Sequence, residues 1–137
     1  MKLQESGQMY LKEILLLNHE TGFVRSIDIA HRMNFSKPSV SRAMGILKRE
    51  GYITVGENGQ IVLTEKGETA ATDIYEKYCL LKLFLIHILG VEQDLAHKEA
   101  CKIEHIVSDE TIDKIERYLQ KNNVIIDTSL KTDHSKS

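Results

Sequence analysis

The stretch HKEACKIEHIVSDE contains three side chains that could together bind a metal ion. Cys101, Glu104 and His105 stand at positions i, i+3 and i+4. On an α-helix this spacing places a thiol, a carboxylate and an imidazole on one face, one turn apart. Such a mixed set of sulfur, oxygen and nitrogen donors suits a borderline or soft divalent cation. Three groups from one helix rarely complete a coordination shell, so a fourth ligand must come from elsewhere.

The same residues also have an ordinary structural interpretation. A cysteine on an apolar helix face usually packs as a small hydrophobe, and a glutamate–histidine pair on a helix is usually solvated. Cys79, in the apolar stretch of the preceding helix, is read as a core residue for the same reason. From spacing alone, both a metal site and a plain helix face remain open.

The candidate ligands lie in a run of predicted helices. We expect a long helix over about 65–89, capped by Thr64 and stopped by Gly90. A helix over about 93–106 follows and carries the three side chains. A further helix runs from about 109 to 122 and is capped by Ser108. The polar residues 124–137 are predicted to be a disordered tail.

The first half of the chain has a different pattern. Apolar residues at helical spacing predict a helix over 8–20, a short helix over 27–33 capped by Ser26, and a helix from the N-cap Ser36 to about residue 50. YITVGENGQIVLT then reads as two short strands around a turn. This order is typical of a winged helix-turn-helix. The predicted fold is mainly α: an N-terminal winged helix-turn-helix over 1–63 with a small β-hairpin wing, then an α-helical segment over 64–123.

The charge distribution favours nucleic acid as a partner of the first half. Between Phe23 and Tyr52 six basic residues stand against two acidic ones, a net +4 in a chain whose total is −2. The start of the third helix combines small hydroxyls with two cations, which suits phosphates and base edges, although any solvated helix face can look similar. The predicted DNA-binding residues are Arg25, Ser36, Lys37, Pro38, Ser39, Ser41, Arg42 and Arg49.

Over most of residues 8–122 the chain resembles the diphtheria toxin repressor family of iron- and manganese-dependent transcription regulators. The resemblance rests on QMYLKEI, SKPSVSRAM, LTEKG, ILGV and HKEACKIEHIVSDE. It implies that 64–123 is a metal-binding and dimerisation domain, with the dimer interface on the apolar faces of the long helix and of 109–122. Many iron-type members carry an extra SH3-like domain, so this chain is expected to be a short form without it.

The resemblance also implies a ligand set. The family's principal site corresponds to Met9, Cys101, Glu104 and His105, and the soft methionine–cysteine pair favours Fe²⁺, with Mn²⁺, Co²⁺, Ni²⁺ or Zn²⁺ as possible substitutes. Of the family's second site only His97 is kept, because Tyr78 and Lys82 occupy the other two positions. A lysine ammonium repels a cation, so this second site is expected to be degenerate.

The resulting prediction is a metal-dependent repressor that binds double-stranded operator DNA as a homodimer and controls metal homeostasis. The alternative is a winged-helix regulator that has lost metal sensing and responds to redox at a cysteine or to a protein partner. An enzyme is not expected, because neither a carboxylate dyad nor a phosphate loop accompanies the cluster. Without an apolar span or signal core, we expect a cytoplasmic protein with no membrane partner, no disulfide framework and no small organic ligand.

Overall fold

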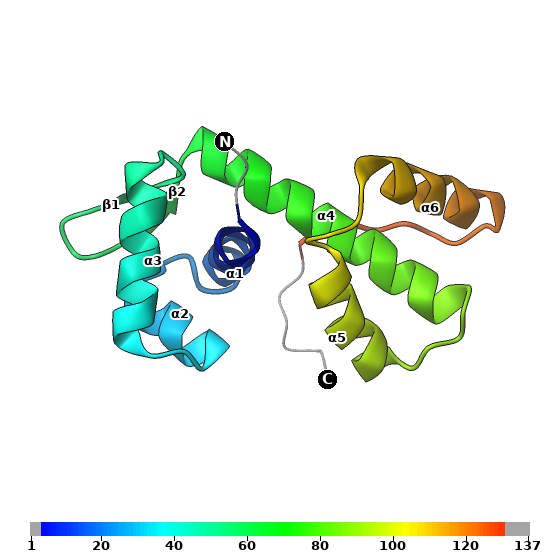
Figure 1. The fold of residues 1–137 in the computed structure, drawn as a ribbon, viewed down its shortest axis with the longest axis horizontal. Coiled ribbons are helices and arrows are strands. Elements are labelled where there is room, and N and C mark those ends of the chain that lie inside the picture. Colours follow the sequence, from blue (N-terminus) through cyan, green and yellow to red (C-terminus); the bar gives the residue numbers. More distant parts are fainter. Residues whose placement is uncertain (1–3, 131–137) are drawn as a thin grey trace. The chain divides into compact units, whose positions relative to one another are not determined.

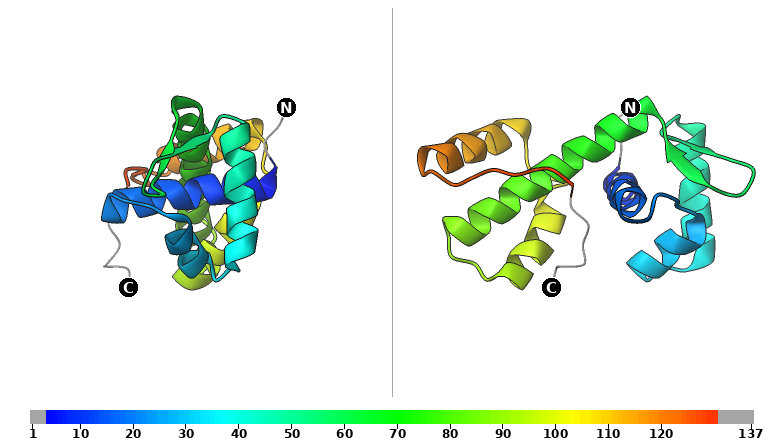
Figure 2. Two further views of the ribbon diagram at one scale, coloured as in Figure 1. Left: turned by 90° about the vertical axis from the view of Figure 1, so that its left-hand side faces the viewer. Right: turned by 180° about the vertical axis from the view of Figure 1, so that it is seen from behind.

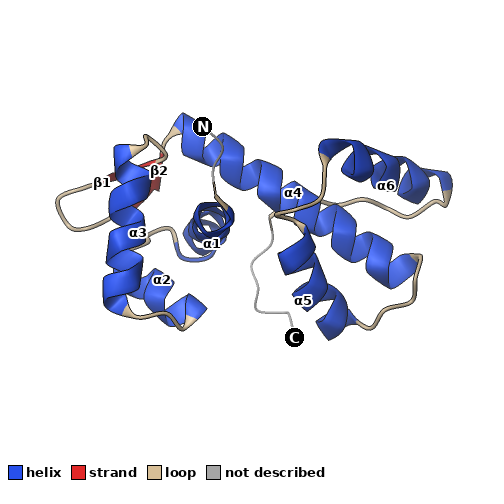
Figure 3. Ribbon diagram, viewed as in Figure 1, coloured by secondary structure: helices blue, strands red, loops and turns tan. Residues whose placement is uncertain are grey.

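The computed structural model describes residues 4–130, which form two compact units. The boundary between the units falls inside one helix, between Thr72 and Asp73, and the second unit extends to Ser129. The helices and strands of the described residues (Figures 1 and 3) are α1 (Glu5–Thr21), α2 (Ser26–Met33), α3 (Lys37–Arg49), β1 (Ile53–Val55), β2 (Ile61–Leu63), α4 (Glu65–His87), α5 (Gln93–Ile103) and α6 (Asp109–Lys121).

The predicted tail over 124–137 is only partly described. Residues 131–137 lie outside the described part of the chain, and residues 124–130 contain no helix or strand. Asp127 organises the end of this segment, because its Oδ1 accepts hydrogen bonds from the Ser129 N–H at 3.0 Å and from the Ser129 hydroxyl at 2.6 Å.

The first unit is a three-helix core with a hairpin, and this confirms the predicted winged helix-turn-helix. Leu11 of α1, Ile29 of α2, Val40 of α3 and Ile53 of β1 are almost completely buried. The apolar stripes predicted from helical spacing are buried as expected, which is why these amphipathic helices pack on one another. The buried members of the stripes of α1 and α3 are Tyr10, Ile14, Leu17, Val40, Met44 and Leu47.

Helix caps explain where the elements of the first unit begin. The Ser36 hydroxyl accepts a hydrogen bond from the Ser39 N–H, so the predicted N-cap of α3 is confirmed. The predicted cap of α2 is wrong by one residue. Ser26 is the first helical residue, and Arg25 is the N-cap because its N–H donates to the Asp28 carboxylate at 2.9 Å.

The hairpin is short and antiparallel. Ile53 of β1 pairs with Leu63 of β2, and Val55 pairs with Ile61. The Ile61 N–H also donates to the Val24 carbonyl at 2.7 Å, which ties the hairpin to the loop after α1. The wing is therefore anchored at its base while its connecting turn extends into solvent (Figure 1).

Gly67 allows α4 to start directly against the hairpin. The Thr64 hydroxyl caps α4 by accepting from the Gly67 N–H at 3.1 Å, and it donates to the Gly51 carbonyl at 2.7 Å. A Cβ atom built on Gly67 would lie only 2.0 Å from the carbonyl oxygen of Tyr52. Glycine is required here because the backbone of Tyr52 occupies the space of a side chain, and any side chain at position 67 would push the two backbone segments apart.

In the second unit, α5 and α6 flank the C-terminal half of α4 (Figures 1 and 2). Leu81 and Leu85 of α4 pack against Ala96 and Ala100 of α5, and these alanines let the two helices approach closely. The helix boundaries differ slightly from the predictions. Helix α4 ends at His87, and α5 ends at Ile103 rather than near residue 106. None of the helices in the described part of the chain is long and apolar enough to cross a membrane.

We expect Gly67→Ala to destabilise the first unit strongly, by about 2–4 kcal/mol, because two backbone segments must move to admit the methyl group. The measurement is the free energy of unfolding in urea. Gly45→Ala in α3 is the matched control, since a Cβ there meets no atom within 4 Å and alanine favours helix. Equal effects of the two substitutions would contradict the proposed role of the close approach.

Candidate nucleic-acid interface and metal centre

The start of α3 presents a polar, basic face. All of the predicted DNA-binding residues, Arg25, Ser36, Lys37, Pro38, Ser39, Ser41, Arg42 and Arg49, are exposed. Within this set the Ser36 and Ser39 hydroxyls bond each other at 2.9 Å, which orders the first turn of the helix. The face therefore offers hydroxyls and cations with little steric bulk, as a helix entering a major groove requires.

Arg32 does not contribute to this basic face, although the charge count included it. Its guanidinium bonds the carboxylates of Glu13 and Glu20, each at 2.8 Å. Burial disfavours the charge on Arg32, but the bonds and charges of the two glutamates outweigh it, so the pKa of the guanidinium is raised. Arg32 of α2 is thus linked to α1 by ion pairs with Glu13 and Glu20, and the Glu13 carboxylate is occupied by this contact.

The three candidate metal ligands straddle the end of α5. Cys101 is in the last turn of the helix, while Glu104 is the C-cap residue, with φ −56° and ψ −24°. The Glu104 N–H still bonds the Ala100 carbonyl, but the His105 N–H bonds the Lys102 carbonyl, three residues back. Cys101 and Glu104 thus keep helical backbone hydrogen bonding, and the chain tightens into a three-residue turn at His105.

Glu104 and His105 form a buried pair. Their side chains are 1% and 2% exposed, and Oε2 of Glu104 lies 3.1 Å from Nε2 of His105. Two donors that bind one ion at about 2.1 Å stand about 3.0–3.4 Å apart for octahedral or tetrahedral angles. The separation of this oxygen and nitrogen therefore fits a shared divalent ion.

A second pair lies one turn earlier on α5. Nε2 of His97 is 3.9 Å from Sγ of Cys101, and Nδ1 of His97 is 2.7 Å from the Tyr78 hydroxyl of α4. Burial, and then the thiols of Cys101 and Cys79, raise the pKa of Tyr78 well above its ordinary value, so its phenol stays neutral. Lys82 places its ammonium 5.7 Å from the centre of the Tyr78 ring.

These contacts are pairs rather than a complete ligand shell. Among residues 4–130 no three histidine, cysteine, aspartate or glutamate side chains are grouped as metal ligands. Met9, the fourth predicted ligand, is half-buried on α1 in the first unit. Lys12, one turn after Met9 on α1, is only 3% exposed, a burial that the local sequence pattern does not predict.

A winged helix-turn-helix with an exposed basic third helix, followed by a helical unit in which Cys, His and Glu side chains form close pairs, defines a class of DNA-binding regulators. Residues 2–60 match the model of the N-terminal DNA-binding domain of iron-dependent repressors, and residues 64–124 match that of their metal-binding and dimerisation domain. The chain belongs to this family of metal-dependent transcriptional repressors, which includes the diphtheria toxin repressor. The resemblance found in the sequence is confirmed.

Two relatives illustrate the extent of the similarity. An uncharacterized HTH-type transcriptional regulator of Methanocaldococcus jannaschii is 32% identical over 120 residues, which cover 87% of this chain and 96% of that protein. The diphtheria toxin repressor of Corynebacterium diphtheriae is 34% identical over 119 residues, covering 87% of this chain and 51% of the repressor. The chain thus spans about half the length of that repressor.

Solved structures agree with this assignment. The manganese regulator SloR matches with a TM-score of 0.75 and 30% identity, over 88% of this chain and 55% of SloR. A manganese-dependent transcriptional repressor in complex with manganese matches with a TM-score of 0.78 and 30% identity, over 83% of this chain and 52% of the repressor chain.

We expect Arg32→Gln to lower the free energy of unfolding by about 1 kcal/mol, because two partly buried carboxylates lose their cation. Arg117→Gln is the control: that arginine also forms an ion pair, with Asp113, but its side chain is 71% exposed. Its loss should change stability by less than about 0.5 kcal/mol. A costlier loss of Arg117 than of Arg32 in chemical denaturation would contradict this assignment.

Proposed function

We propose that the chain is a transcriptional repressor that binds operator DNA as a homodimer when loaded with a divalent transition metal, with Fe²⁺ as the favoured ion. The observation that carries the proposal is the buried Glu104–His105 pair, set at the separation of two ligands of one ion, in a chain that also presents the basic start of α3. Metal homeostasis is the process such a repressor would control.

The proposed ligands are Met9, Cys101, Glu104 and His105, with Met9 assigned from the family resemblance. A thioether and a thiolate favour a borderline ion such as Fe²⁺ over a hard one, and Co²⁺, Ni²⁺ or Zn²⁺ suit the same donors. Solved structures of similar regulators contain bound manganese, zinc or cadmium. A bound ion supplies positive charge beside Glu104 and the Cys101 thiolate.

DNA binding is assigned to α3 and its flanks. Lys37 and Arg42 would neutralise phosphates, and Arg42 could also pair with a guanine edge in the major groove. The exposed serines near the start of the helix provide donors of small size. The exposed turn of the hairpin would sit beside the flanking phosphate backbone, as wings do.

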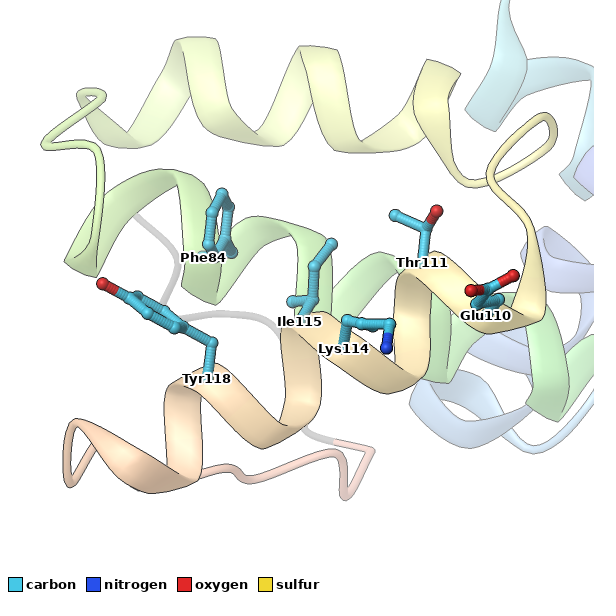
Figure 4. A pocket seen from close by; sticks show the side chains of 6 residues that line it. All are labelled: Phe84, Glu110, Thr111, Lys114, Ile115 and Tyr118. Carbon is cyan, nitrogen blue, oxygen red and sulfur yellow. The ribbon is translucent and has the colours of Figure 1, made fainter.

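Self-association is supported by an apolar groove of about 340 Å³ on the second unit. Figure 4 shows Phe84 of α4 and Ile115 and Tyr118 of α6 around it, with Glu110, Thr111 and Lys114 along α6. The rings of Phe84 and Tyr118 meet edge to face, with centroids 6.3 Å apart, and Tyr118 is 47% exposed. Covering such rings in a second copy of the chain removes apolar surface from water.

Metal binding would act on DNA binding through the dimer. A two-fold dimer must place its two recognition helices about one helical turn of DNA apart, roughly 34 Å, or a multiple of it. An ion that binds one arrangement of the two units better than another shifts the population toward it. In this proposal the metal-loaded arrangement is the one that fits the operator.

The DNA assignment is tested with Lys37→Ala and Arg42→Ala, using DNA selected by the Fe²⁺-loaded protein. Each substitution should weaken binding and reduce the slope of log affinity against log salt by about one, since each removes a phosphate contact. Lys121→Ala, an exposed cation at the end of α6, should leave both quantities unchanged. If both α3 variants kept the salt dependence of the unmodified protein, DNA would bind at a surface other than α3.

The metal assignment is tested by fluorescence anisotropy of the same DNA under anaerobic conditions. Removing Fe²⁺ with a chelator should lower affinity by about 5–150-fold, the usual range of allosteric coupling. His105→Ala and Cys101→Ser should abolish this dependence in folded protein, whereas His19→Ala, at the exposed end of α1, should keep it. Equal affinity of the unmodified protein with and without metal would favour a regulator that has lost metal sensing.

A further inference from the structure

His97 and Cys101 are arranged as two ligands of one ion. They stand at i and i+4 on α5, and Nε2 of His97 is 3.9 Å from Sγ of Cys101. At bond lengths of about 2.1 Å to nitrogen and 2.3 Å to sulfur, two donors on a tetrahedral ion lie about 3.6 Å apart. The observed separation is within a small side-chain rotation of this value.

Tyr78 determines which nitrogen of His97 faces the thiol. The Tyr78 hydroxyl lies 2.7 Å from Nδ1, and the two rings meet edge to face at 87°. When Nδ1–H donates to the tyrosine oxygen, Nε2 carries the lone pair and is turned toward Cys101. Histidines that bind metals are held in this way, with the second ring nitrogen engaged by a neighbouring oxygen.

The surroundings of Tyr78 oppose a separate ion beside His97. Lys82 holds its ammonium 5.7 Å from the tyrosine ring centre, so a fixed positive charge lies close to any ion placed there. His97 itself is exposed at the surface of α5, while Cys101 is half-buried. The imidazole of His97 is therefore accessible to an ion from solvent, and the Cys101 thiol is close enough to bind that same ion.

We infer that His97 binds the same ion as Cys101, with Tyr78 as a positioning residue. The chain then holds one ion, and His97 does not belong to a separate second site. The inference rests on the proposed function and extends its ligand set. His97 joins Cys101 from within α5, and Glu104 and His105 follow directly after that helix. All four side chains belong to the second unit, so this unit alone supplies thiolate, carboxylate and two imidazoles.

The test is an anaerobic titration of the full chain with Co²⁺ alone, followed by absorption spectroscopy. A bound thiolate gives a near-ultraviolet charge-transfer band, and the visible bands report the coordination number. We expect one equivalent per chain and a charge-transfer band that Cys101→Ser removes. His97→Ala should weaken binding by more than about tenfold and change the visible bands while the thiolate band persists.

Two further variants separate positioning from folding. Tyr78→Phe should weaken Co²⁺ binding by about tenfold and shift the visible bands toward those of His97→Ala. His87→Ala, a histidine on an exposed part of α4, should reproduce the unmodified spectrum and affinity.

Three results would overturn the inference. Unchanged affinity and visible bands in His97→Ala would remove His97 from the site. Two equivalents per unmodified chain, of which His97→Ala loses only the one without a thiolate band, would place His97 on a separate ion. If the unmodified protein shows no thiolate–Co²⁺ band at all, the proposed metal site fails together with the inference.

Discussion

A carboxylate and an imidazole buried side by side at the end of α5 place the strongest demand on the second unit. Removing an ionised carboxylate from water costs several kcal/mol unless nearby positive charge or hydrogen bonds compensate. Glu104 and His105 are nevertheless almost fully enclosed. Ala96 and Ala100 pack α5 against α4, and α5 ends at Ile103, directly before this pair. Such burial is the arrangement expected of a site that takes up a cation.

The first unit shows how the same residue types serve two purposes. Arg32 of α2 and Arg42 of α3 are the same type of residue, but their surroundings differ. Arg32 is bonded to two glutamates, whereas Arg42 is exposed. The surface proposed to bind DNA is therefore less positive than the charge count of residues 23–52 indicates, and its positive charge is concentrated at α3 and its flanks. In the proposed binding of α3 to DNA, two cations among serines mean that groove shape and hydrogen bonding would contribute as well as charge.

Most of the fold could be predicted because it depends on local signals. Helical spacing of apolar residues identified the buried stripes of α1 and α3, and capping residues located the starts of α3, α4 and α6 within a residue. The start of α2 was misplaced by one residue because the Asp28 carboxylate accepts the N–H of Arg25, which makes Arg25 and not Ser26 the N-cap. The end of α5 was misplaced because no glycine or proline marks it. Tertiary contacts, such as those of Arg32 with Glu13 and Glu20 or of Tyr78 with His97, join residues 12 to 19 positions apart, and no local pattern encodes them.

The close approach of Gly67 to Tyr52 joins the hairpin to the start of α4 at a tight corner. The glycine of LTEKG is required because a carbonyl oxygen occupies the space of its missing side chain. The steric requirement at this position comes from the corner between hairpin and helix and does not depend on what the second unit binds. LTEKG therefore marks a backbone corner, and the signal to which this chain responds has to be sought in the residues around α5.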